Sequence, residues 1–165
     1  MTLADFNAAP AGDAAATASV WAAVPSWVDA VIAARPYASV DDAAGVAGHE
    51  ADRWTRADLD AALAHHPRIG HKPVGEAAEA RASRREQASM ATASDDLAQA
   101  MAAANAAYEE RFGRVFLIRA AGRSPEEMLA EAQRRLGNDD DTETTEAIEQ
   151  LRQIALLRLR AALEG

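Results

Sequence analysis

Residues that start and stop helices recur along this chain, and their positions constrain its fold more than any other feature. The segments between them are rich in alanine, which has the highest intrinsic helix propensity. Serine, threonine or aspartate precedes most of these segments, and proline or glycine follows several of them. The pattern predicts helices over residues 14–23, 27–34, 40–54, 56–64, 76–90, 95–112, 125–137 and 143–163.

The expected helix ends depend on particular residues. Gly113 is the expected C-cap of the helix that ends at Phe112, because glycine adopts the left-handed conformation at little cost. Pro125 follows Ser124 in the order typical of a helix start, with serine at the N-cap and proline at the first helical position. The remaining expected N-caps are Asp13, Ser26, Ser39, Thr55 and Ser94.

Only one stretch of the chain has the character of a β-strand. It covers residues 114–120 and contains Val115-Phe116-Leu117-Ile118. A single short strand cannot build a sheet, so we expect a buried connection here. Residues 70–75 and 138–141 are expected to be a loop and a polar turn. We find no internal repeat or dividing linker, so residues 1–165 are predicted to form one all-α domain, a compact bundle of about seven or eight helices.

The composition narrows the classes of partner. The net charge is −9, which argues against binding to nucleic acid or to an anionic membrane, because phosphates require a basic face. No apolar stretch approaches the roughly 20 residues that span a bilayer, and the start of the chain does not resemble a signal peptide. The chain contains no cysteine, which excludes disulfides and thiolate metal sites. We therefore expect a cytoplasmic protein.

Two adjacent histidines are the first candidates for chemistry. His65 and His66 precede Pro67 in the segment His65-His66-Pro67-Arg68-Ile69-Gly70. Histidine exchanges protons near neutral pH, and a position at a helix end beside a rigid proline keeps it out of the core. The alternative is that both are ordinary surface residues at a helix terminus.

A second group of candidates lies in the helix predicted over residues 76–90. Ser83, Glu86 and Gln87 are three and four residues apart, so they share one helix face. Together they offer a hydroxyl, a carboxylate and an amide, which suit a flat, urea-like molecule. The alternative is a solvated face beside Arg84 and Arg85.

Arg158 is the third candidate. It lies four residues after Ile154 and four before Ala162, so it falls on or beside the apolar stripe of the last helix. A guanidinium directed inward needs an anion or several acceptors, because burial of a bare charge is costly. An internal salt bridge, or a side chain that extends to water, remains the alternative.

Several other types of site do not fit the sequence. His49-Glu50 is not followed by a second histidine at metalloprotease spacing. His65, His66 and His71 have no carboxylate placed to complete a recognisable metal site, so we expect no metal. The chain also has no glycine-rich phosphate loop and no nucleophile elbow.

Several short motifs are spread over nearly the whole chain. They are Leu3-Ala4-Asp5-Phe6-Asn7, His66-Pro67-Arg68-Ile69-Gly70, Ser83-Arg84-Arg85-Glu86-Gln87, Asn105 to Gly113, Phe116-Leu117-Ile118, Arg134 to Asn138, and the helix that carries Arg158-Leu159. Each motif is weakly specific by itself, but together and in this order they resemble one enzyme family, that of 2-oxo-4-hydroxy-4-carboxy-5-ureidoimidazoline (OHCU) decarboxylase.

The resemblance implies an all-helical fold, usually a homodimer, and an enzyme that uses no cofactor. The family's catalytic histidine, glutamate and arginine match His66, Glu86 and Arg158. Its substrate-binding positions match Pro67, Ser83 and Gln87, together with the backbone of Phe116 and Ile118. One departure is Val115, where many members have proline, which puts the path of the chain there in doubt.

The implied activity is decarboxylation of OHCU to (S)-allantoin in urate degradation. Two other functions compete with it. One is a related cofactor-free hydrolase or isomerase of ureido or hydantoin acids, which product analysis would distinguish. The other is a non-catalytic helical interaction domain, in which His66, Glu86 and Arg158 would be scattered.

Overall fold

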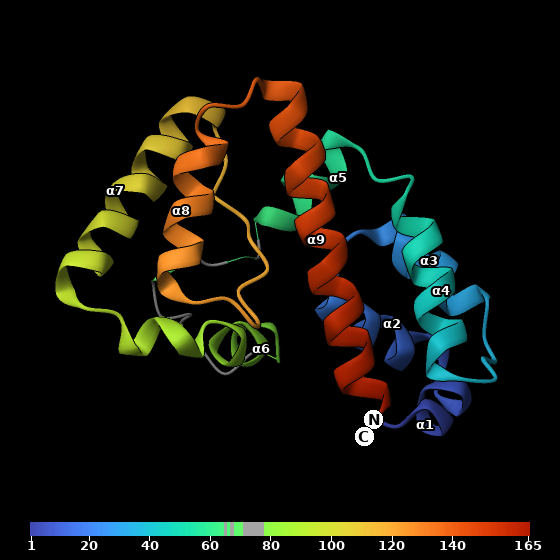
Figure 1. The fold of residues 1–165 in the computed structure, drawn as a ribbon. Helices are drawn as coiled ribbons and strands as arrows, with labels where there is room; N and C mark the ends of the chain where they lie inside the picture. Colours follow the sequence, from blue (N-terminus) through green and yellow to red (C-terminus); the bar gives the residue numbers. More distant parts are fainter. Residues whose placement is uncertain (65, 67, 71–77) are drawn as a thin grey trace. The chain divides into compact units, whose positions relative to one another are not determined.

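A computed structural model describes residues 1–64, 66, 68–70 and 78–165, and in this part of the chain every regular element is helical. The all-α fold class is therefore confirmed. Figure 1 shows the order of the elements: α1 (Leu3–Ala8), α2 (Ala11–Trp21), α3 (Pro25–Ala33), α4 (Val40–Ala51), α5 (Arg56–Leu63), α6 (Ala78–Glu86), the 3₁₀ helix η1 (Ala88–Thr92), α7 (Asp95–Phe112), α8 (Pro125–Arg135) and α9 (Asp140–Leu163).

Most of the predicted cap residues are confirmed. The side chains of Ser39, Ser94 and Ser124 each accept a hydrogen bond from a backbone N–H in the first turn of the helix that follows. Thr55 does the same for Asp58, at 3.3 Å. Gly113 has a φ of 71° and closes α7 in the left-handed conformation, as predicted.

Other predicted boundaries are wrong, each for a local reason. Helix α1 was not predicted, and it begins with a capping box between Thr2 and Asp5. Helix α2 starts at Ala11, so Asp13 lies in its first turn and is not the cap. Helix α3 starts at Pro25, one residue before the expected cap Ser26. The helix expected to continue to Met90 changes to a 3₁₀ helix after Gln87.

The start of α9 also differs from the prediction. Residues 138–141 were expected to be a turn, yet the helix begins at Asp140. The side chain of Asp139 accepts a hydrogen bond from the Thr142 N–H at 2.7 Å, and its carbonyl accepts one from the Glu143 N–H at 2.9 Å. Asp139 therefore acts as the cap, and Asp140 and Asp141 occupy the first turn, where the helix dipole favours negative charge.

The chain divides into two compact units. Unit 1 comprises Met1–Ala62 and Leu151–Gly165, and unit 2 comprises Leu63–Gln150. None of the helices in the described residues combines the length and the apolar character needed to cross a bilayer.

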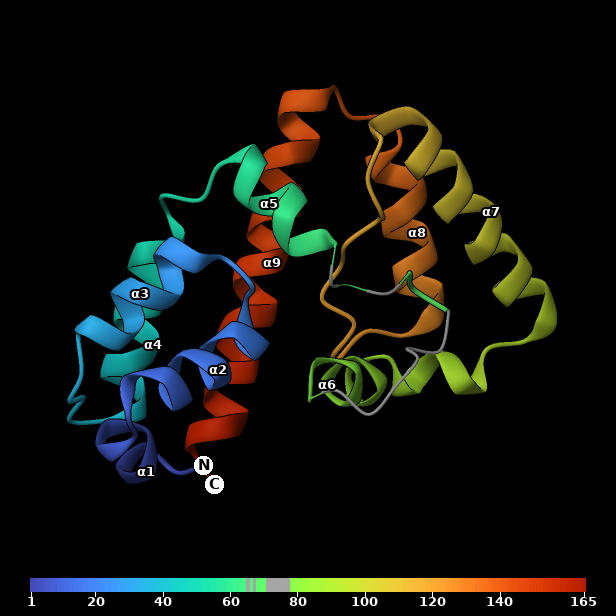
Figure 2. The ribbon, with the colours of Figure 1, turned by 180° about the vertical axis from the view of Figure 1, so that it is seen from behind.

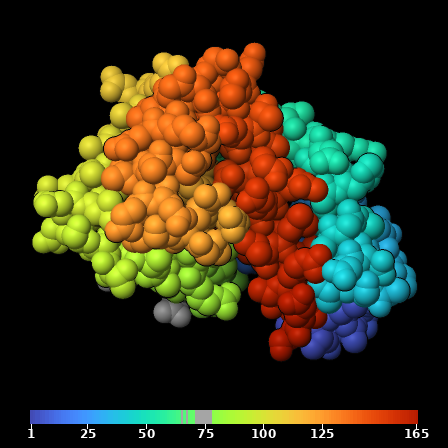
Figure 3. Space-filling model, in the orientation of Figure 1, coloured from blue at the N-terminus to red at the C-terminus, as the bar shows by residue number. Residues whose placement is uncertain are grey.

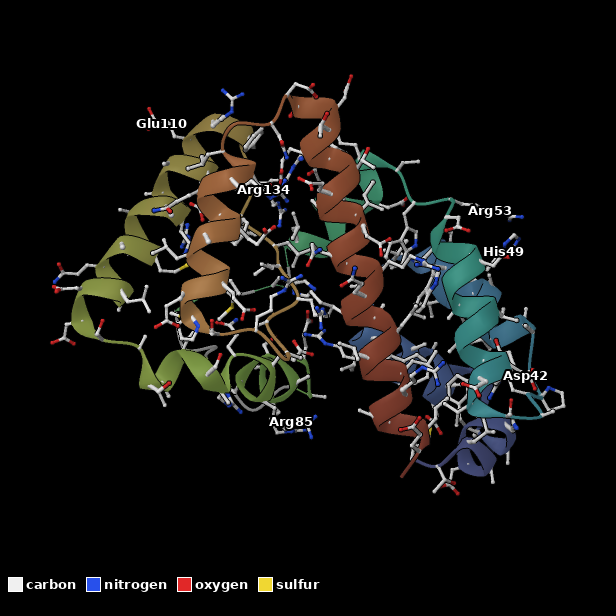
Figure 4. The ribbon with its side chains drawn as sticks, in the orientation of Figure 1. Asp42, His49, Arg53, Arg85, Glu110 and Arg134 are labelled. Atoms are coloured by element: carbon white, nitrogen blue, oxygen red, sulfur yellow. The ribbon has the colours of Figure 1, made fainter. Side chains whose placement is uncertain are left out.

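Unit 1 has a core of aromatic rings and alanine. Helix α2 packs on α3, and α3 packs on α4. The rings of Trp27 and Trp54 meet edge to face, with centroids 5.7 Å apart, and Trp27 Nε1 donates a hydrogen bond to the Ala47 carbonyl at 2.8 Å. The outer side of α4 is charged, and Figure 4 shows Asp42 and His49 there. His49 is therefore a surface residue beside Asp52.

Unit 2 contains most of the candidate residues. Helices α7 and α8 pack side by side, and Figure 3 shows the orange atoms of α8 directly against the yellow-green atoms of α7. The connection between these helices runs alongside α8 in both Figure 1 and Figure 2. It carries Phe116 and Ile118 into a core shared with Ile69, Met101, Ala104, Tyr108, Ala120, Met128 and Ala132.

Candidate functional site

His66 lies just after α5, and its backbone N–H donates a hydrogen bond to the Leu63 carbonyl at 3.1 Å. Its side chain is only 7% exposed, so it is not an ordinary surface residue. The ring nitrogen Nε2 lies 3.9 Å from Oε1 of Glu79, on α6. The candidate histidine is therefore withdrawn from solvent and has a carboxylate beside it. His65 and Pro67 lie outside the described residues.

Helix α6 brings the second group of candidates together. Ser83 is almost completely buried, with 2% of its surface exposed, and Glu86 is half-buried. Glu79 precedes Ser83 by four residues and Glu86 follows it by three, so the three side chains share a face. The solvated face that was the alternative for Ser83 is excluded by its burial.

Gln87 is the first residue after α6, and it makes a contact that the sequence did not predict. Its side-chain carbonyl oxygen accepts a hydrogen bond from the Gly70 N–H at 3.1 Å. Gly70 has a φ of 86°, a conformation that glycine adopts without strain. Gln87 thus holds the end of the His66–Gly70 segment with its oxygen and has its NH₂ group as a donor for other acceptors.

Two residues of α7 fasten the same segment. Asn105, which is 3% exposed, donates a hydrogen bond from Nδ2 to the Ile69 carbonyl at 2.8 Å. The guanidinium of Arg68 binds both carboxylate oxygens of Glu109, with NH2 to Oε2 at 3.1 Å. Gln87 and these two residues of α7 therefore hold the backbone and side chains of Arg68–Gly70 in a defined position.

The predicted buried connection over residues 114–120 is confirmed. Phe116 and Ile118 are each 2% exposed, and Val115 is half-buried. An extended chain cannot satisfy its own backbone groups as a helix does, so other groups must do so. The Leu117 carbonyl accepts a hydrogen bond from Arg135 at 2.8 Å, and the Arg119 N–H donates one to the side chain of Gln150 at 2.9 Å.

Arg135 belongs to a charged network inside unit 2. Arg135 and Glu143 form a buried ion pair, with side chains 2% and 0% exposed. Nε of Arg135 lies 2.9 Å from Oε1 of Glu143, and the guanidinium stacks over the ring of Phe116 at 4.7 Å. The network therefore fixes both the carbonyl of Leu117 and the ring of Phe116 in the candidate site.

Tyr108 completes this network from α7. Its hydroxyl donates a hydrogen bond to Oε1 of Glu143. Burial, and then this hydrogen bond to an anion, raise the pKa of Tyr108 well above its usual value. The phenol therefore stays protonated and serves as a fixed donor to Glu143. Asn138 provides another donor, at 3.1 Å from Oε2.

Arg158 belongs to the half of α9 in unit 1. It is 6% exposed, so the inward direction predicted from the helix stripe is confirmed. One guanidinium nitrogen donates a hydrogen bond to the Val20 carbonyl at 2.8 Å. Val20 is in the last turn of α2, where carbonyls lack a partner within the helix. Its expected convergence with His66 and Glu86 stays a prediction, since those residues belong to unit 2.

Four residues of the site region were not predicted to be site residues: Glu79, Asn105, Arg135 and Glu143. All are polar residues on predicted helices, where a solvated face is the ordinary expectation. For Arg135 a signal was present, because it follows Ala132 by three residues and Met128 by seven, on the stripe that α8 buries.

A metal site was not expected, and the geometry of the described residues does not suggest one. In those residues, histidine, aspartate and glutamate side chains nowhere gather in threes as metal ligands would. His65 and His71 are outside this part of the chain, so the expectation of a metal-free site stays a prediction.

Comparisons with known proteins point to one family. A family model described as OHCU decarboxylase matches residues 7–160. A 2-oxo-4-hydroxy-4-carboxy-5-ureidoimidazoline decarboxylase from Amia calva is 32% identical over 137 residues, which are 82% of this chain and 78% of the relative. A protein of the same name from Haloferax volcanii is 28% identical over 126 residues, which are 76% and 73% of the two chains.

Solved structures with the same fold are also found. A crystal structure of OHCU decarboxylase in the presence of (S)-allantoin aligns with a TM-score of 0.75 and 24% identity, over 89% of this chain and 96% of that one. A crystal structure of (S)-allantoin synthase aligns with a TM-score of 0.71 and 16% identity. The second alignment covers 99% of this chain and 54% of the longer one.

Proposed function

We propose that this chain, which belongs to the OHCU decarboxylase family, removes carbon dioxide from OHCU and forms (S)-allantoin in the degradation of urate. The observation that carries the proposal is the family match over residues 7–160. The local geometry supports it, because His66 is withdrawn from solvent beside the polar face of α6.

The substrate can supply its own electron sink. One ring carbon carries the carboxylate and a hydroxyl, and its neighbour belongs to a C=N bond. When the bond to the carboxylate breaks, its electron pair moves toward the C=N group, and the ring nitrogen takes a proton. The ureido-bearing carbon is then protonated as the hydroxyl loses its proton and becomes the ring carbonyl. No pyridoxal, thiamine or metal is demanded by this chemistry.

The protein must then hold the substrate and manage protons. We assign His66 and Glu86 to proton transfer at the hydroxyl and the reacting carbons, which contributes on the order of 10²–10⁴-fold. We assign Ser83 and Gln87 to orienting the ureido and ring amides, and the resemblance adds Pro67 to the substrate-binding residues. The backbone of Phe116 and Ile118 completes the binding surface.

We assign Arg158 to the carbonyl oxygen and the developing negative charge of the substrate. A planar guanidinium donates two parallel hydrogen bonds to such groups, which an ammonium does not match. The assignment rests on the family resemblance and on the burial of Arg158. Arg158→Lys keeps the positive charge but removes the paired N–H donors of the guanidinium, so it tests whether those donors are needed. It should weaken both binding and turnover, whereas Arg160→Lys on the same helix should change neither.

The decisive test is the chirality of the product, because OHCU also decays without enzyme to racemic allantoin. Freshly generated OHCU should disappear faster with the protein, and circular dichroism should report a single enantiomer. Racemic product at the uncatalysed rate, from folded protein, would overturn the proposal.

Variants then test the assigned residues. His66→Ala and Glu86→Ala should each reduce kcat/KM by about 10²–10⁴-fold. The double variant should be little worse than either single one, because residues that act as a unit are not additive. His65→Ala is the matched control and should be milder. If His65→Ala were the inactive variant, the assignment of His66 would be wrong.

A homodimer and a cytoplasmic location belong to the same proposal. The family resemblance supports the first, and light scattering of the purified protein tests it. The cysteine-free sequence is compatible with a reducing compartment, and cell fractionation tests the location.

A further inference from the structure

Helix α6 carries two carboxylates, Glu79 and Glu86, and that of Glu79 lies beside the candidate histidine. Glu79 lies seven residues before Glu86, which is two turns of the helix, so both carboxylates are on one face. The buried Ser83 lies between them. The carboxylate of Glu79 lies next to the His66 ring.

The distance and the burial define the interaction. Nε2 of His66 and Oε1 of Glu79 are 3.9 Å apart, which is too long for a direct hydrogen bond but within ion-pair range. The two side chains are 7% and 22% exposed. Water screens such a pair less than it screens an exposed one.

The described part of the chain places other charged groups on this segment and on α6. On the segment itself Arg68 carries a positive charge, and both oxygens of Glu109 from α7 neutralise it. Helix α6 contributes Glu79 and Glu86 on the face with Ser83, whereas Arg84 and Arg85 are exposed. Figure 4 shows Arg85 directed away from the ribbon.

We infer that Glu79 is a positioning residue, which orients the imidazole of His66 and stabilises its protonated form, while Glu86 is left to act on the substrate. This inference rests on the proposed function, in which His66 transfers protons. It assigns different roles to two acidic residues of α6 that are two turns apart. A carboxylate that orients a metal-binding histidine typically contributes about 10- to 100-fold to activity or affinity, and we expect an effect of similar size here.

The first experiment follows His66 itself and needs no substrate. The imidazole signals of the four histidines are titrated by NMR, and His66→Ala identifies the signal of interest. Loss of a neighbouring negative charge disfavours the imidazolium, so Glu79→Gln should move the His66 midpoint to lower pH, by about 0.5–1 unit. Glu110→Gln is the control, because it removes the same charge from an exposed site on α7, which Figure 4 labels.

The second experiment measures decarboxylation in the same proteins. Glu79→Gln should lower kcat/KM about 10- to 100-fold and move the acidic limb of its pH profile in the same direction as the NMR midpoint. Glu79→Asp keeps the charge on a shorter side chain, so it should give intermediate values in both experiments. It also serves as the test if Glu79→Gln does not fold.

The outcomes separate this inference from the proposed function. If the wild-type protein did not decarboxylate OHCU, the proposed function would fail, while the NMR midpoint would still report whether the pair exists. If the wild-type protein were active and Glu79→Gln matched Glu110→Gln in both experiments, the inference alone would be overturned. A shifted midpoint with unchanged kcat/KM would overturn the positioning role.

Discussion

The two units bury different kinds of side chain. In unit 1 the largest buried groups include Trp21, Trp27 and Phe6, and alanines fill the space between the helices. In unit 2 an arginine, a glutamate and a tyrosine lie at the same depth, since Arg135, Glu143 and Tyr108 are 1%, 0% and 0% exposed.

The difference follows from the backbone that each core encloses. Helices satisfy most of their own N–H and C=O groups, so the core of unit 1 can be mainly hydrocarbon. Unit 2 buries the extended connection over residues 114–120, and its carbonyls need donors from elsewhere. Arg135 supplies one to Leu117, and Glu143 balances the charge that this introduces. A charged core is thus the consequence of burying an irregular segment of the candidate site.

Among the variants that test this difference between the units, Arg135→Met should have the largest effect on the free energy of unfolding. The variant leaves Glu143 as an unpaired buried charge, which typically costs about 3–5 kcal/mol in the free energy of unfolding. Urea denaturation followed by circular dichroism measures the loss. A change below about 1 kcal/mol would show that the network is not part of the stable core.

The double variant Arg135→Met/Glu143→Leu sharpens the interpretation. Neither charge is then stranded, so most of the lost stability should return. Decarboxylation should stay reduced, because the Leu117 carbonyl has lost the donor that fixes it. Recovery of both stability and decarboxylation would mean that the network does not position the connection over residues 114–120.

An intermediate effect is expected in the alanine core of unit 1. Ala47 is fully buried, and its carbonyl accepts the hydrogen bond from Trp27. Ala47→Leu adds three carbons to a filled space and should cost about 1–3 kcal/mol. Ala16→Leu, at an exposed position of α2, is the control and should stay within about 0.5 kcal/mol of the wild type. Equal effects in the two variants would contradict tight packing at Ala47.

The smallest effect is expected at Arg134, the neighbour of Arg135 in sequence but not in environment. Arg134 is half exposed and binds Glu131 and Glu146 at 2.9 and 2.8 Å. Its hydrogen bond lowers the pKa of Glu131. Burial acts to raise the pKa of Glu146, but hydrogen bonds from Arg134 and Asn138 outweigh it and lower the value.

The pH dependence of Arg134→Gln follows from these directions. A lowered pKa in the folded state contributes stability above the unfolded glutamate pKa of about 4.3, and this is lost as the pH falls through the folded value. Arg134→Gln should therefore cost at most about 1 kcal/mol at pH 7, because the pair is well solvated. The difference from wild type should shrink on acidification. A cost that grew toward low pH would contradict the two shifts.

The sequence predicted the features that depend on local chemistry. Gly113 and Ser124 end and begin helices through contacts with their immediate neighbours, and the apolar run at Phe116 predicted a buried connection. The burial of Arg158 followed from the helix period. In each case the decisive interactions lie within a few residues or on one helix stripe.

The features that were missed depend on distant partners. Glu143 is an ordinary acidic residue in an acidic stretch, and only its contacts with Arg135 and Tyr108 make it a core residue. Glu79 likewise becomes a candidate only through its position beside His66, which is thirteen residues earlier in the sequence. No local pattern distinguishes such glutamates from those that face water.

The anchoring of the Arg68–Gly70 backbone by Asn105 and Glu109 affects how loss-of-function variants should be interpreted. A mutagenesis screen scored by turnover would recover these two positions together with His66, and activity alone would not tell them apart. Chemical rescue would distinguish the two kinds of position. Imidazole added to His66→Ala can substitute for the missing proton carrier, whereas no small molecule in solution replaces a side chain whose task is to hold the backbone in place.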